Sequence, residues 1–140
     1  MESMETSLKT ELSTEAIHDH VCDVAKRFVD LYYMTVVKKN LDISKMYCDN
    51  ARMIFQGMCI EGKDEIAKLL SNLPECDFSV LDIDAQNLAA DEILSRILIA
   101  VTGICERQTE LRRFSHTFNI IKQGRIWLIE SDRLRVMEHV

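Results

Sequence analysis

The sequence predicts an α+β protein, because apolar residues follow a helical period in the first half of the chain and a strand period in the second. Apolar side chains recur at steps of three and four from Ile17 to Val36 and again from Ile66 to Leu73, just before Pro74. The segments after Asp77 are rich in Ile, Val, Phe and Leu and are broken by short polar stretches. The 140 residues suffice for one domain with a core of its own.

The first predicted helix is long and amphipathic, and it begins at Ser13 or Thr14, where a hydroxyl can cap the first turn. Its buried stripe is formed by Ile17, Val21, Val24, Phe28 and Leu31. Cations and a residue suited to a left-handed conformation at Lys38–Asn40 mark its end. We expect residues 1–13 to form a flexible acidic tail and residues 14–140 to form a single domain.

Short elements follow this helix. We expect a short helix at Leu41–Cys48 and a strand pair formed by Met53–Phe55 and Met58–Ile60. The turn between the two strands is predicted at Gln56–Gly57. A third helix has apolar positions at helical spacing and is stopped by Pro74.

Four long strands are predicted in the second half of the chain, at Phe78–Ala85, Ile93–Ile104, Leu111–Ile121 and Arg125–Val136. Polar breaks such as Ala90–Asp91 and Gln123–Gly124 separate them. Within Ile97–Val101 and Ile126–Ile129 apolar side chains point to both faces, which is typical of a sheet that is covered on both sides. Because three helices can cover only one face, we expect a second protein chain on the other.

Charge and cysteine usage narrow the class of protein. The net charge is −6, the first twenty residues are acidic, and the charges of the last third are mixed, so direct nucleic-acid binding is not expected. The apolar runs are far shorter than a membrane-spanning helix requires, and the acidic start is unlike a signal peptide. An odd number of cysteines without a C-x-x-C pair favours reduced thiols in the cytosol or nucleus.

Candidate chemistry is sparse. His18 and His20 could suggest a metal site, but positions i and i+2 do not share a helix face, and we expect no metal and no cofactor. His116 lies between Phe114 and Phe118 on one strand face. Such a histidine is either an acid–base group in an apolar pocket or, more often, a hydrogen-bonded residue of a core or an interface.

Two charged pairs point to an interface instead. Asp82 and Asp84 share one strand face by their spacing, and Arg133 and Arg135 share a face near the end of the last strand. If these faces associate with a partner, each carboxylate requires a cation there, ideally an arginine that binds it through two hydrogen bonds.

A set of short segments, taken in order, resembles the nuclear transport factor 2 superfamily and, within it, the related export proteins. The resemblance runs from about Ile17 to Val140. The segments are Phe28–Tyr33, Met46–Tyr47, Phe55–Gly57, Leu73–Pro74, Asp84–Gln86, Val101–Gly103, Arg113–Phe114, Thr117–Phe118, Trp127 and Ser131–Arg135. The resemblance implies a cone-shaped fold in which three helices pack in a strongly curved, mostly antiparallel sheet.

The resemblance also implies a function. The chain would be a non-catalytic subunit that heterodimerises with a large nuclear RNA export receptor, stabilises its matching domain and supports binding of nucleoporin Phe-Gly repeats during mRNA export. It would shuttle between nucleus, nuclear pore and cytoplasm. Asp84 and Arg135 occupy the positions of the family's interface salt bridges. The expected partner interface comprises Asp84, Gln86, Arg113, His116, Trp127, Arg133 and Arg135.

Two alternatives remain open. The import carrier of this superfamily is a homodimer that binds the GDP form of Ran through an aromatic residue and an acid at the turn and through two acids in a later loop. Here Gln56 stands at the position of the turn acid, and Arg107 is among the positions of the later loop. The cone also hosts isomerases and dehydratases, and His116 facing an open pocket would favour such an activity. The sequence thus favours an interaction subunit over an enzyme.

Overall fold

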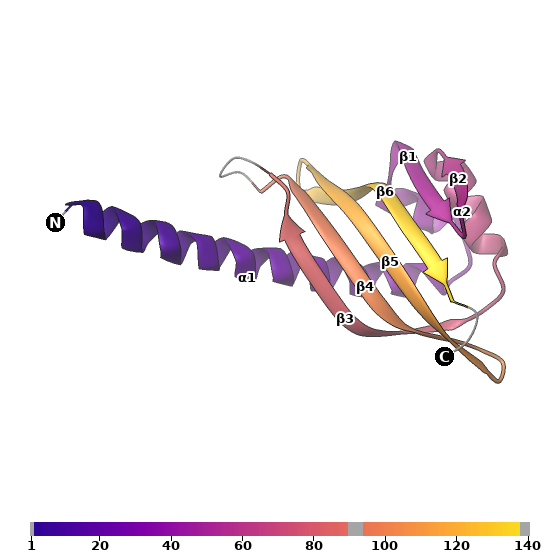
Figure 1. Ribbon diagram of the computed structural model, residues 1–140. Coiled ribbons are helices and arrows are strands. Elements are labelled where there is room, and N and C mark those ends of the chain that lie inside the picture. Colours follow the sequence, from indigo (N-terminus) through magenta and orange to yellow (C-terminus); the bar gives the residue numbers. More distant parts are fainter. Residues whose placement is uncertain (1, 90–93, 138–140) are drawn as a thin grey trace.

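A single six-stranded sheet forms the centre of this computed structural model, which describes the backbone of residues 2–89 and 94–137 and the side chains of residues 14–89 and 94–137. The strands are β1 (Tyr47–Phe55), β2 (Met58–Glu61), β3 (Asp77–Asn87), β4 (Arg96–Arg107), β5 (Glu110–Gln123) and β6 (Ile126–Val136). Their order across the sheet is β2-β1-β6-β5-β4-β3, and only β1 and β6 pair in parallel. Helix α1 crosses behind the sheet, as Figure 1 shows. The predicted α+β class is confirmed.

Helix α1 spans Glu2–Val36, so the predicted start at Ser13 or Thr14 is wrong. The first residues include Glu, Met, Leu and Lys and lack Gly and Pro, and these residue types favour helix continuation over a cap. The N-terminal part of α1 projects beyond the sheet (Figure 1). The expectation that residues 1–13 are flexible stays a prediction.

The middle segment matches the prediction in outline. A 3₁₀ helix, η1, spans Leu41–Met46, whereas Tyr47 and Cys48 already belong to β1. The side chain of Asn40 caps η1 by accepting a hydrogen bond from the backbone N–H of Asp42 at 2.9 Å. The predicted β1–β2 turn is confirmed. Helix α2 spans Lys63–Asn72 and supplies the third helical element.

The four long strands run antiparallel and have two irregularities. The register slips between Val80 and Asp82 in β3, and again in β6 opposite Asn119 and Ile120 of β5. The polar break predicted at Ala90–Asp91 lies outside the described residues. The other predicted strand segments are confirmed with ends that differ by a few residues.

The core lies between the sheet and the helices. Phe28 of α1 packs edge-on against Phe118 of β5, with ring centroids 5.8 Å apart, and Tyr33 packs likewise against Phe114. The inner face of the sheet is therefore the one that carries Phe114 and Phe118, and the side chains that alternate with them form the outer face. No described helix is long and apolar enough to cross a membrane.

The cysteines are all free thiols, but they do not all pack as small hydrophobes. Cys48 and Cys105 are buried, whereas Cys22 and Cys59 are exposed. Burial first, and then the neighbouring Cys105, raises the pKa of the Cys76 thiol to about 11.

Candidate partner-binding face

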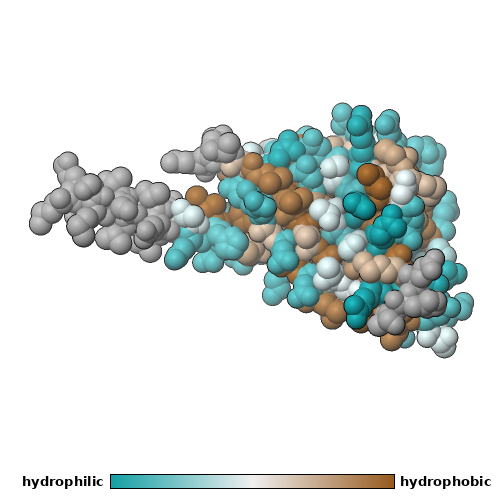
Figure 2. Space-filling model, in the orientation of Figure 1, coloured by the Kyte–Doolittle hydropathy of each residue, from teal (hydrophilic) through white to brown (hydrophobic). Residues whose placement is uncertain are grey.

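The outer face of the sheet carries most of the residues that the sequence assigns to a partner interface. One row across the strands runs from Asp84 through Ala100 and Thr117 to Arg133, and its members are directly opposite one another. Asp84, Thr117 and Arg133 are exposed. Figure 2, which views this side of the molecule, shows hydrophilic and hydrophobic side chains interspersed.

A second row repeats the arrangement. It runs from Asp82 through Thr102 and Ser115 to Arg135. Thr102 donates a hydrogen bond of 3.4 Å from its hydroxyl to the Asp82 carboxylate. Two more of the predicted interface residues, Gln86 and Arg113, flank these rows and are also exposed on the outer face.

Charge is separated across this face. The two carboxylates lie on β3 and the two arginines on β6, three strand spacings or about 14 Å away. That separation exceeds the screening length of about 8 Å at physiological salt, so the two groups do not neutralise each other. A flat partner that offers cations to β3 and carboxylates to β6 would complement both.

The centre of the face differs from the expectation. Ala100, Thr102, Ser115 and Thr117 lie between the charged groups, so the centre is built of small and mostly polar side chains. The prediction that the outer face is apolar holds only at its margins, where Leu98 and other aliphatic residues are half-buried. Small side chains permit close approach of another sheet.

Two predicted interface residues lie elsewhere. His116 is completely buried on the inner face, so its assignment to the interface is corrected. Trp127 is half-buried and packs against the core on the same side as Ile129, so it too lies away from the outer face. The alternation of side chains along β5 correctly placed His116 on the same face as Phe114 and Phe118. Alternation alone does not tell which face of the sheet the helices cover.

His116 belongs to a buried polar network. Its Nε2 lies 2.7 Å from the Asp132 carboxylate, and its Nδ1 lies 3.1 Å from the hydroxyl of Tyr33. Tyr47 donates its hydroxyl proton to the same Asp132 oxygen at 2.7 Å, and Tyr32 lies 3.0 Å from Tyr47. Burial first, and then the negative charge of Asp132, raises the pKa of Tyr32, Tyr33 and Tyr47. This is the hydrogen-bonded core histidine that the sequence favoured.

The mouth of the cone is filled by side chains. The cavity beside Tyr32 and Tyr33 has a volume of about 30 Å³ and is closed by residues such as Leu70 and Leu134. A small-molecule site usually needs about 300 Å³ or more. His116 therefore does not face an open pocket, which was the observation that would favour an isomerase or dehydratase.

The β1–β2 turn is fastened to the end of β6. Gln56 adopts the left-handed conformation at φ 49°, and its amide both donates to the Val136 carbonyl at 2.9 Å and accepts from the Val136 N–H at 2.8 Å. A carboxylate in its place could accept from the Val136 N–H but could not donate to the Val136 carbonyl. Gln56, which stands where the resemblance places an acid, thus links the β1–β2 turn to the end of β6.

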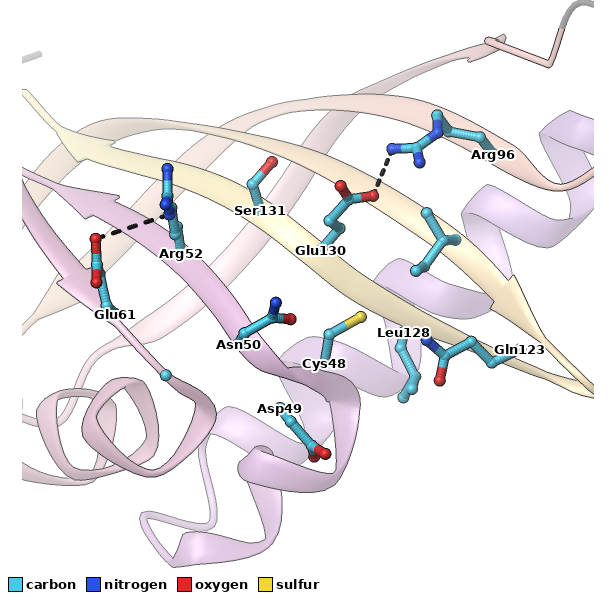
Figure 3. Close-up of a pocket in the computed structure, with 12 residues that line it drawn as sticks. Cys48, Asp49, Asn50, Arg52, Glu61, Arg96, Gln123, Leu128, Glu130 and Ser131 are labelled. Atoms are coloured by element: carbon cyan, nitrogen blue, oxygen red, sulfur yellow. Dashed lines mark hydrogen bonds and ion pairs between the residues drawn. The ribbon is translucent and has the colours of Figure 1, made fainter.

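Sequence reasoning missed an open polar groove at the β1 side of the outer face (Figure 3). Its volume is about 1010 Å³, and it opens where the β1–β6 pairing is interrupted between Tyr47 and Arg52. Arg52 pairs with Glu61 at 3.7 Å, and Arg96 pairs with Glu130 (Figure 3). A third acid of the lining, Asp49, pairs at 2.8 Å with Lys63 outside the groove. Among the described residues, no three metal-ligating side chains cluster.

The fold and its face define a small α+β domain whose curved sheet leaves one charged surface for another molecule. The model of the nuclear transport factor 2 (NTF2) domain matches residues 24–136. The chain therefore belongs to the nuclear transport factor 2 family, as the sequence resemblance indicated.

Two curated relatives extend over nearly the whole chain. NTF2-related export protein 2 of Homo sapiens is 25% identical over 138 residues, covering 94% of this chain and 97% of the relative. NTF2-related export protein of Caenorhabditis elegans is 24% identical over 136 residues, covering 94% and 99%.

Solved structures confirm the fold. Ntf2 from Cryptosporidium parvum has a TM-score of 0.71 at 20% identity, covering 86% of this chain and 94% of the other. A chain in the complex of the yeast deubiquitinase Ubp3 with its Bre5 cofactor has a TM-score of 0.73 at 20% identity, with 85% and 98% covered.

Proposed function

We propose that this chain is a non-catalytic subunit of a nuclear RNA export receptor, with which it heterodimerises through the outer face of its sheet. The observation that carries the proposal is the separation of carboxylates on β3 from arginines on β6 across a surface of small side chains. The kinship with export proteins supplies the biological setting. The filled cone supports a role without catalysis.

The partner follows from the chemistry of the face. A receptor domain of similar fold would place an arginine opposite Asp84 and a carboxylate opposite Arg135. Burying the face would stabilise that domain, and the complex would support contact with nucleoporin Phe-Gly repeats during mRNA export. The subunit would then shuttle between nucleus, nuclear pore and cytoplasm, with no cofactor and no direct contact to nucleic acid.

The test measures mass by light scattering, for the chain alone and co-expressed with a receptor's matching domain. We expect a one-to-one complex that Asp84→Arg weakens by about tenfold or more, because it places like charges opposite each other. Asp23→Arg is the matched control, since Asp23 is an exposed acid of α1 away from the outer face. A complex that tolerates Asp84→Arg as well as the control would refute the interface.

A homodimer is the second candidate, and one observation favours it. Because acids and arginines stand at opposite ends of the same rows, a two-fold rotation would bring the acids of one copy onto the arginines of another. The purified protein would then have twice the 16.2 kDa mass of one chain. The dimer would not form a heterodimer when the receptor domain is added. The use of Gln56 in fastening β6 weighs against the Ran-carrier form of this candidate.

A further inference from the structure

An apolar groove of about 510 Å³ lies on the helix side of the molecule, between α1, η1 and the start of β6. Val24, Phe28, Met46 and Trp127 line it on the helix side, and Leu128, which also lines the polar groove of the outer face, lies at its margin. Leu31 and Ile126 stand at its edges and are 55% and 57% exposed. Large apolar side chains exposed together in a concave site mark a place where another molecule binds.

The rim of the groove is basic. Arg27 and Lys45 line it, and none of the acidic residues that the structure describes does. Lys45 also has a loose ion pair with Asp42 at 3.5 Å, with both side chains largely exposed. An apolar floor with a cationic rim fits a segment that carries apolar residues on one side and carboxylates on the other.

The chain itself contains a segment of this kind. Residues 1–16 carry four glutamates against the single Lys9, and Met4, Leu8 and Leu12 stand four residues apart. The backbone from Glu2 is helical and extends beyond the sheet (Figure 1).

Glu15 and Ala16, near the start of the described side chains, are exposed. A helix of this length is marginal in water without a surface to pack on. Because α1 runs straight from the extension into the body of the same chain, the extension cannot fold back onto its own groove.

We propose that residues 1–16 of a second copy of this chain dock in the groove, with their glutamates toward Arg27 and Lys45. The groove lies on the helix side of the sheet, so this contact leaves Asp84 and Arg135 on the outer face free. The contact is therefore independent of the proposed receptor interface. It would link subunits without using the face that binds the receptor.

The first experiment titrates a synthetic peptide of residues 1–16 into the full chain at low concentration. The sequence contains one tryptophan, Trp127, and it lies in the groove, so its fluorescence reports occupancy directly. We expect saturable binding that is about tenfold weaker with Arg27→Glu and weaker at raised salt. Lys26→Glu is the matched control, since Lys26 is an exposed neighbour that does not line the groove.

A peptide with all four glutamates changed to glutamine tests the charge, and a peptide of scrambled order tests the spacing. Both should bind at least about tenfold more weakly. No saturable change in Trp127 emission, or equal affinity for the scrambled peptide or for Arg27→Glu, would overturn the proposal.

Sedimentation of the full chain and of a chain lacking residues 1–12 identifies the occupant. Self-association of the same strength without those residues would show that they contribute nothing to it and would overturn the proposal, whereas a weaker remainder would belong to the outer face. Circular dichroism of Arg27→Glu excludes unfolding as the cause of a loss. Retained binding of Arg27→Glu to the receptor domain separates this proposal from the proposed function.

Discussion

Replacing Tyr47 by phenylalanine removes one hydroxyl from the buried network and leaves the ring in place. Tyr47 is only 2% exposed, and its hydroxyl donates to Asp132 at 2.7 Å. The other partner of that carboxylate oxygen is Nε2 of His116. The second oxygen of Asp132 has no hydrogen-bond partner within the described residues. The carboxylate would therefore lose one of its two donors.

The expected cost follows from the kind of hydrogen bond that is lost. A bond to a charged acceptor contributes about 1.5–3 kcal/mol, and the buried acceptor finds no replacement. The Tyr32 hydroxyl loses its 3.0 Å partner as well. We expect Tyr47→Phe to lower the free energy of unfolding by about 2–3 kcal/mol. Tyr33→Phe removes the 3.1 Å hydrogen bond between the Tyr33 hydroxyl and Nδ1 of His116, which leaves both donors of the Asp132 carboxylate in place, and should cost about 1 kcal/mol.

Urea unfolding followed by Trp127 fluorescence measures both variants at pH 7. With an m value of about 2 kcal/mol/M, Tyr47→Phe should lower the midpoint by about 1 M, and Tyr33→Phe should lower it by half as much. A cost for Tyr47→Phe that is no larger than that for Tyr33→Phe would refute the reasoning. It would mean that the Asp132 carboxylate does not depend on the Tyr47 hydroxyl.

Two further outcomes are expected. Gly103→Ala should lower stability by about 3 kcal/mol in calorimetry, because the new Cβ would stand 2.1 Å from a backbone oxygen of β3; an unchanged melting temperature would show that β3 can move away. Alkylation of Cys76 should keep accelerating up to about pH 11, and stability should fall as pH rises from 9 to 11, because the folded chain disfavours the thiolate. A rate that levels off by pH 9 would contradict the burial of this thiol.

Local patterns predicted the long strands and the outer face because both depend on neighbours in sequence. A period of two placed Asp84 with Asp82 and Arg133 with Arg135, and the structure places all four on the outer face. The start of α1 was missed because a capping residue marks where a helix can begin, not where it must. A run of residue types with high helix propensity precedes Ser13 in the sequence, and this propensity outweighs the preference of a serine for a cap position.

The buried network could not be predicted for a different reason. Asp132 is an acid in a strand whose alternation is broken by the register slip opposite Asn119 and Ile120. The slip turns both Ile129 and Asp132 inward although they are three residues apart. Its partners also come from elements far away in the chain, since Tyr47 precedes Asp132 by 85 residues. No local pattern carries that information.

The two surfaces of this domain lie on opposite sides of one sheet, and this has a consequence for assembly. The carboxylates of β3 and the arginines of β6 face outward, whereas Arg27 and Trp127 belong to the helix side. Occupying one surface does not cover the other, so the affinity of each surface for its ligand should be the same whether or not the other ligand is bound. Two routes for coupling between them exist: β6, which carries both Trp127 and Arg135, and the packing of α1 against β3.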